Sequence, residues 1–398
     1  MAKASEALFG PEHLELLTKH LQQLNQFHPH PNRKLYQDSV LITLLLGFYH
    51  PSVRSLRTLE DQSCGEDFQR YLPLPRVCRS TLSDALAHME GKHLLPIVHA
   101  LMKQVPALRR QDGDLHALLK RIIAGDGSVF TVPADVMWAI AQTRTNGQPG
   151  RKIRLNLQLD VLQWMPITFS VSGADDASES AAFIKDLVAD VIYVHDRNFA
   201  DFKFIRAVFA AGSDLVVRLK EHSPNFVPLR ENPLTDADRQ AHVISDRIGY
   251  VPGSAGAPGF GQRLLREVIV IDPRSGKPVR LLTSLLDLPA RIIGLIYRHR
   301  WMIELFFKWL KCIARVRHLF SHSPNGIATE FYVAVIMVLL TYLRTGQRPS
   351  IYAFNCLGWV ASGQMSAARA QEVLARRQRE RDLERLRLAH KRAAKIAG

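Results

Sequence analysis

The sequence is poor in cysteine, and we expect it to carry no secretion signal. Its four cysteines, Cys64, Cys78, Cys312 and Cys356, are far apart and form no CxxC or Cys/His cluster. They predict neither a zinc site nor a disulfide framework, and a reducing cytoplasm suits them best. The N-terminus, MAKASEALFGPEHLELL, has polar residues where a signal peptide carries an apolar segment, so we expect no such signal.

Long hydrophobic runs are also missing. The longest, FYVAVIMVLLTYL at 331–343, is too short to cross about 30 Å of hydrocarbon. We interpret it as a core helix and expect no membrane partner beyond a surface association.

The common nucleotide and hydrolase signatures are absent. The Gly-Asp-Gly at 125–127 lacks the glycine spacing of a dinucleotide-binding loop and opens no obvious helix. The sequence contains neither a Walker loop nor a Ser/His/Asp arrangement with a nucleophile elbow. A Rossmann-type enzyme is therefore disfavoured.

What the sequence does have is positive charge. Its 398 residues are 47% hydrophobic and 22% charged, which is typical of a folded protein of two or three modules. The formal net charge is +15 and the pI is about 9.9. A polyanionic partner, nucleic acid above all, is the natural physical interpretation.

The residue patterns along the chain predict helical N- and C-terminal regions on either side of a mixed α/β centre. Leucines recur at helical spacing through residues 1–118, which predicts a helical N-terminal domain with a possible DNA contact or a purely structural role. Residues 346–398 form a basic helical C-terminal region, which either touches phosphates or is a solvated end.

The central part, 119–345, alternates between strands and helices. LKRIIAGDGSVFTV at 119–132 and a hairpin around Leu162 and Gln163 predict strands, and helix and strand then alternate through residue 220. Residues 221–285 are rich in Gly and Pro and then in β-branched residues, which predicts a β-rich insertion. The predicted fold class is α/β, with a mixed-sheet catalytic domain.

The stretch YRHRWMIELFFKWLK at 297–311 predicts a helix that is buried nearly all round. Tyr297, Arg300, Glu304, Lys308 and Lys311 fall within one narrow stripe, and apolar residues cover most of the rest. Such a polar stripe is expected to line a cleft.

Three acids stand out by context. Asp126 and Asp196 each end an apolar strand, and Glu304 lies on the predicted buried helix. Ligand groups in open α/β sheets lie beyond strand ends, so these carboxylates could converge and hold Mg²⁺. Taken singly, each has an ordinary alternative: a turn or cap for Asp126, an ion pair with Arg197 for Asp196, and a helical pair with Lys308 for Glu304.

The combination resembles a known family. Tyr297-x2-Arg300-x3-Glu304-x6-Lys311 is similar to the YREK signature of the IS-four family of bacterial insertion-sequence transposases, whose catalytic domain is RNase H-like. Asp126 in DGS and Asp196 in DRNF stand where that family has its two catalytic aspartates. Many relatives have Gly where this chain has Asn198.

The resemblance implies a DDE transposase. Asp126, Asp196 and Glu304 would be the catalytic triad that holds two Mg²⁺ ions, for which Mn²⁺ can substitute. Tyr297, Arg300, Lys308 and Lys311 would grip phosphates of double-stranded DNA, both at the transposon's inverted-repeat ends and in the target.

The same resemblance implies a homodimer in the synaptic complex, a bacterial cytoplasmic location at the nucleoid, and a hairpin intermediate. Some relatives hold a flipped base on a Trp in the insertion, but this chain has no Trp between Trp164 and Trp301, which leaves Tyr250 or Phe260 as candidates. Two other functions stay open: an RNase H-like nuclease that cuts without joining, and an inactive, transposase-derived DNA-binding protein.

Overall fold

The chain folds into two compact units in the computed structural model. One comprises Met1–Val105 and Trp309–Gly398, here called the helical unit, and the other comprises Pro106–Lys308, here called the sheet unit. The structure describes residues 17, 20–24, 35–50, 53–69, 71–72, 74–104, 115, 120–132, 135–143, 149–173, 179–221, 225–253, 259–261, 263–313, 319–345, 351–361 and 364–397.

A ten-stranded mixed sheet organises the sheet unit, in the order β2-β3-β1-β5-β6-β10-β9-β8-β7, with β4 paired to β3. Its first five strands in the chain are β1 (Arg121–Val132), β2 (Ile140–Thr143), β3 (Pro149–Asp160), β4 (Met165–Ser172) and β5 (Val191–His195). The others are β6 (Asp214–Arg218), β7 (Val227–Glu231), β8 (Val243–Tyr250), β9 (Leu265–Ile271) and β10 (Pro278–Thr283).

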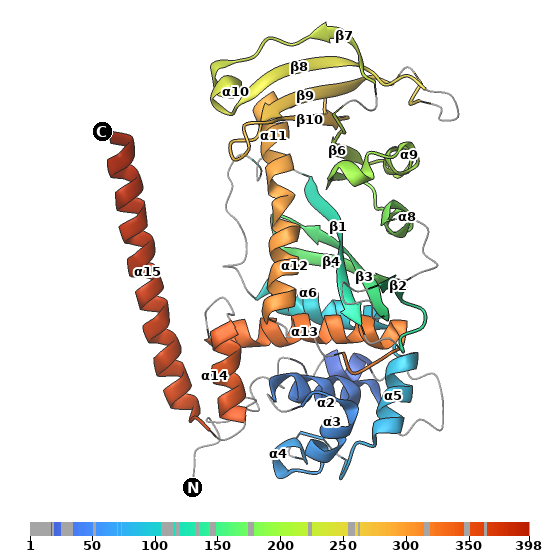
Figure 1. The fold of residues 1–398 in the computed structure, drawn as a ribbon, viewed down its shortest axis with the longest axis vertical. Helices are drawn as coiled ribbons and strands as arrows, with labels where there is room; N and C mark the ends of the chain where they lie inside the picture. The colour runs from blue at the N-terminus through green and yellow to red at the C-terminus, as the bar shows by residue number, and fades with distance from the viewer. Residues whose placement is uncertain are drawn as a thin grey trace. The chain divides into compact units, whose positions relative to one another are not determined.

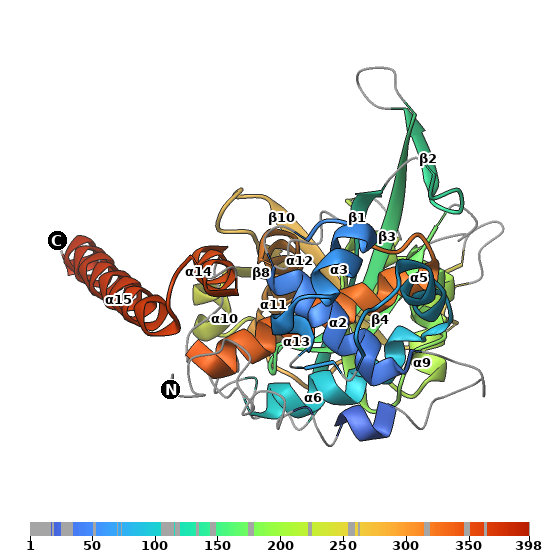
Figure 2. The same cartoon turned by 90° about the horizontal axis from the view of Figure 1, so that it is seen from below.

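The centre of this sheet is mixed, as the sequence patterns predicted, and its strand order agrees with the RNase H-like domain that the resemblance implied. β1, β3 and β4 pair antiparallel, and β5 and β6 then add in parallel beside β1. The short β2 pairs with the start of β3 (Figure 2). Parallel neighbours need a crossover, and α8 (Glu179–Ile184) and α9 (Phe202–Ala210) lie in the two crossover connections.

The strands bury both faces. Ile123, Val191 and Tyr193 pack into one core cluster with Phe183 of α8 and Phe204 of α9. Side chains alternate along a strand, so the even-numbered residues of β1 and β5 lie on the opposite face. There α11 (Ala290–His299) packs against β5 and β6.

The insertion predicted at 221–285 is β-rich, as expected. β7, β8, β9 and β10 form an antiparallel extension of the sheet, joined to it through β10 and β6. The short α10 (Asp236–Gln240) precedes β8 and begins with a capping box between Thr235 and Asp238.

The predicted helix at 297–311 is interrupted. α11 ends at His299, Arg300 lies at the junction, and α12 runs over Trp301–Ile313. The N–H of Arg300 donates to the Tyr297 carbonyl (3.1 Å), and the N–H of Ile303 donates to the Arg300 carbonyl (3.1 Å). Both bonds span three residues, so the backbone tightens at Arg300.

The prediction that this segment is buried nearly all round is partly wrong. Met302, Ile303, Phe306 and Phe307 are buried, but Trp301 is 43% exposed and Leu305 is 37% exposed. Positions 301, 305 and 308 share one helical face, and Lys308 is exposed as well. α12 therefore has an open face beside the polar stripe.

The helical unit is built around α13 (Pro324–Thr345), which contacts α2, α5, η2 and α6. The helices and 3₁₀ turn of its N-terminal part are α2 (Gln37–Tyr49), α3 (Leu56–Ser63), α4 (Glu66–Gln69), α5 (Arg79–His88), η2 (Gly91–Leu94) and α6 (Leu95–Lys103). Gly91 permits a close approach, because a Cβ there would lie 2.9 Å from the Tyr332 ring. The Asn325 amide donates to the Ala87 carbonyl (3.1 Å), which fixes the start of α13.

α13 extends beyond the apolar run at 331–343. Among the described residues, one helical stretch, Pro324–Leu343, is long and apolar enough to cross a membrane, and 89% of its most apolar window is buried inside the protein. The burial agrees with the predicted core helix. The sequence grouped this helix with the catalytic domain, whereas its contacts place it among the helices of 1–105.

Two further helices complete the helical unit. α14 (Ile351–Ala361) and the first turns of α15 (Ala367–Ala397) share a small core of Ala353, Cys356, Ala370, Val373 and Leu374. The rest of α15 extends from α14 as one long helix (Figure 1). Its Leu383 and Leu386 are each 58% exposed.

Candidate active site

Strand register brings Asp126 and Asp196 together. β1 and β5 are parallel, and Ala124 pairs with Val194. Asp126 and Asp196 each follow two residues later, so they lie on the same face of neighbouring strands. Asp196 still has extended backbone, and its Oδ1 accepts the N–H of Asn198 (2.8 Å) as a cap of the 3₁₀ turn η4 (Arg197–Phe199). Asn198 is not among the residues with positive φ, so its replacement of glycine costs no strain here.

Glu304 comes to the same face from α12. Phe306, two residues later, is buried and packs against Trp164 and Phe169, with ring centroids 5.2 and 6.3 Å apart. These contacts hold the first turns of α12 against β4 and the turn that precedes it. Glu304 itself keeps 31% of its side-chain surface exposed, which leaves its carboxylate accessible.

Arg300 links Glu304 to Asp126. Its guanidinium forms an ion pair with Glu304 Oε1 and lies 3.9 Å from Asp126 Oδ2. The Arg300 side chain is only 13% exposed. Burial acts to lower the pKa of Arg300, but Tyr297, Glu304 and Asp126 outweigh it and raise the pKa above its ordinary value. Arg300 thus stays charged between two acids.

On the other face of the sheet, Gly125 and His195 interlock beneath the two aspartates. A Cβ at Gly125 would lie 2.3 Å from His195 Cε1, so only glycine lets this ring cross β1. The ring is fully buried, 4.3 Å from Phe199 and 4.8 Å from Phe204 between centroids. Burial lowers the pKa of His195 to about 3, so the imidazole is neutral. The contact fixes the spacing of the residues that precede both aspartates.

The donor chemistry of the three acids fits a hard divalent cation, because all three offer carboxylate oxygens. In the part of the chain that the structure describes, no group of three or more His, Cys, Asp or Glu side chains is arranged to hold a metal ion. Two of the three carboxylates are paired with Arg300, and the third, that of Asp196, caps η4. The acids therefore share a neighbourhood without yet sharing a coordination centre.

The other residues of the predicted DNA-binding stripe differ in setting. The Tyr297 ring lies 5.9 Å from the Arg300 guanidinium carbon, on the last turn of α11. Lys308 is exposed on α12, one turn after Glu304. Lys311 lies further along α12, in the stretch assigned to the helical unit, and is half-buried.

A pocket of about 560 Å³ adjoins this stripe, and the sequence did not predict it. Tyr297, Arg300 and Trp301 line it together with Arg218 of β6, Val270 of β9 and Arg274 of the turn between β9 and β10. The Arg274 guanidinium lies over the Trp301 ring, 5.4 Å from its centroid. Trp301 was the missed residue, because its place in an apolar helix gave no sign of exposure.

The aromatic candidates proposed from sequence lie elsewhere. Phe260 packs against Phe202 and Phe209, with ring centroids 4.9 and 5.9 Å apart, as part of the sheet unit's core. Tyr250 is the last residue of β8 and is half-buried. Neither lines the pocket beside Arg300.

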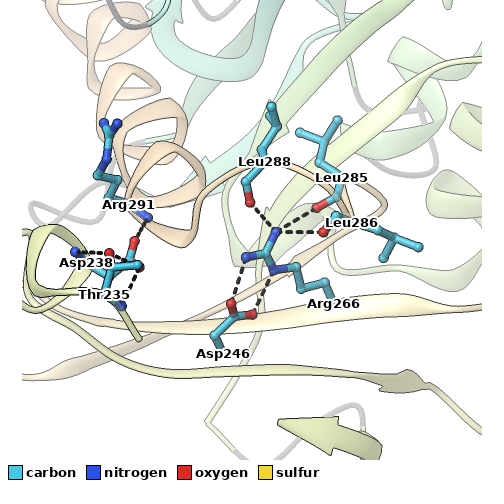
Figure 3. A network of polar contacts seen from close by, with 8 residues as sticks. All are labelled: Thr235, Asp238, Asp246, Arg266, Leu285, Leu286, Leu288 and Arg291. Atoms are coloured by element: carbon cyan, nitrogen blue, oxygen red, sulfur yellow. Dashed lines mark hydrogen bonds and ion pairs between the residues drawn. The ribbon is translucent and has the colours of Figure 1, made fainter. Parts of the chain in front are cut away.

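A polar network in the insertion fixes the start of α11 (Figure 3). Arg266 of β9 and Asp246 of β8 form a buried bidentate pair, with both N–O distances 2.7 Å. The same guanidinium donates to three carbonyls of the segment before α11, those of Leu285, Leu286 and Leu288.

α11 has no side-chain cap of its own, and the insertion supplies one. Its N-cap is Pro289, which makes no capping hydrogen bond. Instead Asp238 of α10 accepts the N–H of Arg291 at 2.9 Å (Figure 3). A carboxylate at a helix N-terminus also complements the helix dipole. The insertion therefore orients the helix that leads to Arg300 and Glu304.

Comparison with known proteins assigns the chain to a family. A family model described as Transposase DDE domain matches residues 118–340. The chain belongs to the transposase DDE-domain family. The resemblance to insertion-sequence transposases is thereby confirmed, and members of this family generally use divalent metal ions.

Two curated relatives agree with the family. A putative transposase, y4zB, of Sinorhizobium fredii is 24% identical over 148 residues, which are 37% of this chain and 41% of that protein. A putative transposase for insertion sequence element IS4SA of Synechocystis is 22% identical over 272 residues, 66% of this chain and 71% of that protein. The chain thus spans less than half the length of the first relative.

Among solved structures, this chain is similar to a cryo-EM structure of the piggyBac transposase synaptic complex with hairpin DNA. The match covers 89% of this chain and 78% of the piggyBac chain. Its TM-score is 0.40 at 9% sequence identity.

Proposed function

We propose that this protein is a DDE transposase that cuts DNA at the ends of an insertion sequence and joins those ends to target DNA. The observation that supports the proposal is the strand register and the ion pairing that bring three acids from distant parts of the sequence into one neighbourhood. Asp126 and Asp196 follow paired positions of parallel strands, and Arg300 ties Glu304 to Asp126.

In this proposal Asp126, Asp196 and Glu304 hold two Mg²⁺ ions, for which Mn²⁺ can substitute. When bound, such ions activate a water or a 3′-hydroxyl and neutralise charge on the phosphate under attack. The chain's own task is positioning. β1 and β5 fix the two aspartates through backbone pairing, and the packing of Phe306 holds Glu304 opposite them.

The DNA partner is double-stranded, both at the inverted-repeat ends and in the target. Tyr297, Arg300, Lys308 and Lys311 bind its phosphates, because guanidinium, ammonium and phenolic groups donate to phosphate oxygens. Joining two ends calls for two copies, so we propose a homodimer in the synaptic complex, acting at the nucleoid in the bacterial cytoplasm.

A hairpin intermediate requires a base to leave the stack. We propose that Trp301 takes this base in place of Tyr250 or Phe260. Its ring is 43% exposed, it lines the 560 Å³ pocket, and Arg274 lies over it. Aromatic rings bind bases of any sequence by stacking.

The test uses a duplex that contains the DNA at the borders of the gene, where the proposal places the inverted repeats, incubated with the protein and Mg²⁺ or Mn²⁺. We expect cleavage at the repeat ends and joined product when target DNA is added. Asp126→Asn should lower the cleavage rate at least about a hundredfold, because it removes a metal-binding charge. Asp236→Asn makes the same chemical change on the exposed face of α10 and serves as the control.

Two results would support the alternative functions instead of transposition. Metal-dependent cleavage without any joined product would indicate an RNase H-like nuclease. Binding of repeat-end DNA without metal-dependent cleavage would indicate an inactive, transposase-derived DNA-binding protein, which the charge of +15 would also suit.

A further inference from the structure

Arg300 occupies the place between two acids where a bridging cation is expected. Its guanidinium pairs with Glu304 and lies 3.9 Å from Asp126 Oδ2, while the side chain is 13% exposed. A DNA-gripping residue would instead be expected to point its charge toward solvent. The observed position is that of an internal counter-ion.

Electrostatics explains this position. Asp126 and Glu304 are 21% and 31% exposed, so their mutual repulsion is incompletely screened. A guanidinium between them offsets the repulsion. A divalent cation carries twice the charge and approaches carboxylate oxygens to about 2.1 Å, so it competes effectively for the same oxygens.

The structure also has room for Arg300 to leave. Arg300 lines the 560 Å³ pocket, whose wall includes Tyr297 and Trp301. Its guanidinium carbon already lies 5.9 Å from the Tyr297 ring centroid. Arg300 lies at the junction between α11 and α12, and its guanidinium can turn by rotation about side-chain bonds alone, with no change in the backbone.

We propose that Arg300 is an exchangeable counter-cation of the metal site. It holds Asp126 and Glu304 together before metal binds, and a divalent cation displaces it. The released guanidinium turns into the adjacent pocket and binds a DNA phosphate. Metal loading and DNA binding are thereby coupled through one side chain. This inference rests on the proposed function, since it takes Asp126 and Glu304 as metal ligands.

Mn²⁺ binding to the full chain without DNA tests the exchange. The electron paramagnetic resonance signal of free Mn²⁺ gives the dissociation constant. Arg300→Gln should lower the Kd for Mn²⁺ about tenfold, because the metal no longer has to break a charge-assisted hydrogen bond, and the free energy of one such bond corresponds to about that factor. Lys308→Gln removes the same charge from the exposed face of α12 and should change the Kd less than about threefold, because solvent screens it.

Arg300→Lys guards against failure of the glutamine variant to fold. A lysine ammonium cannot make the two-sided contact of a guanidinium, so its Mn²⁺ Kd should fall between those of the wild type and Arg300→Gln. An unchanged or weaker Mn²⁺ affinity in both Arg300 variants would refute the exchange. If the wild type and Asp126→Asn bound Mn²⁺ equally, the metal site itself, and with it the proposed function, would be at fault.

DNA binding provides the second measurement. Fluorescence anisotropy with a labelled repeat-end duplex is recorded in EDTA and in Ca²⁺, which occupies oxygen sites and is used here to avoid turnover. The wild type should gain more DNA affinity from Ca²⁺ than Arg300→Gln does, because coupling between two ligands is reciprocal. Equal gains in both proteins would show that the released guanidinium does not reach DNA.

Discussion

The contact between Gly125 and His195 leads to a prediction about the backbone beneath the site. A methyl group at residue 125 would lie 2.3 Å from His195 Cε1, whereas carbon atoms in ordinary contact are about 3.5–4.0 Å apart. The His195 ring cannot move away freely, because Phe199 and Phe204 pack against it, with ring centroids 4.3 and 4.8 Å from that of His195. Either the ring or β1 must move by more than about 1 Å.

Overpacking of this kind costs about 1–3 kcal/mol of unfolding free energy. Gly125→Ala should therefore lower the unfolding temperature of the sheet unit by roughly 2–12 °C, given the scaling for domains of about 200 residues. Circular dichroism and scanning calorimetry measure this shift. Because residue 125 precedes Asp126, cleavage should fall further than the loss of folded protein explains.

Two further variants decide whether the contact is the cause. Gly294→Ala in α11 places its Cβ 3.2 Å from a terminal methyl of Val270, which can yield, and replaces a helical glycine, so it should be neutral or stabilising. Combining Gly125→Ala with His195→Ala should cost less than the sum of the single changes, since the new methyl enters the space of the ring. Strict additivity, or an unchanged unfolding temperature for Gly125→Ala, would refute the reasoning.

Two other predictions concern Glu330 and Trp301. Burial raises the pKa of Glu330 to about 8, against the hydrogen bonds from the Phe320 and Ser321 N–H groups. Above about pH 4.5 the unfolded state releases a proton that the folded state keeps. The contribution of Glu330 to stability is therefore complete below that pH and is lost as the pH rises to 8. The free energy of unfolding falls by up to about 1.4 kcal/mol per pH unit over this range. Urea titrations from pH 5 to 9 should show Glu330→Gln gaining stability relative to the wild type, and a parallel profile would contradict the assignment. Trp301→Ala should weaken repeat-end DNA binding by about 1–3 kcal/mol and reduce hairpin product, whereas Trp301→Phe should retain most of both; full hairpin yield in the alanine variant would remove Trp301 from this role.

Sequence patterns predicted the sheet and the family because both depend on local information. β-branched runs and the turn at Leu162 and Gln163 mark β1, β3 and β4, and strand register then follows from alternation of buried and exposed positions. The spacing from Tyr297 to Lys311 identified the family, which the match at 118–340 confirms. The catalytic roles of individual residues stay predictions.

Other features depend on tertiary contacts that no spacing reveals. The junction at Arg300 was predicted as continuous helix, because neither Pro nor Gly marks the break. Apolar character predicted burial for α12 outside its polar stripe, yet Trp301 and Leu305 are exposed beside a pocket whose other wall comes from β9 and β10. The sequence likewise could not show that the Arg300 side chain would point inward to two acids. The residue type alone does not determine whether an arginine points inward or toward solvent.

The insertion holds the start of α11 in place, and the chemistry of Arg266 explains how. A buried ion pair contributes little net stability compared with an apolar pair, because desolvation offsets its attraction. Its geometry, however, is strict, and Arg266 uses both ends of its guanidinium, one on Asp246 and the other on the carbonyls before α11. With Asp238 capping that helix, the insertion sets the direction of α11 and hence the position of Arg300. A purely apolar contact could hold α11 equally firmly but would leave its rotation free, and a rotation of α11 would withdraw Arg300 from Asp126.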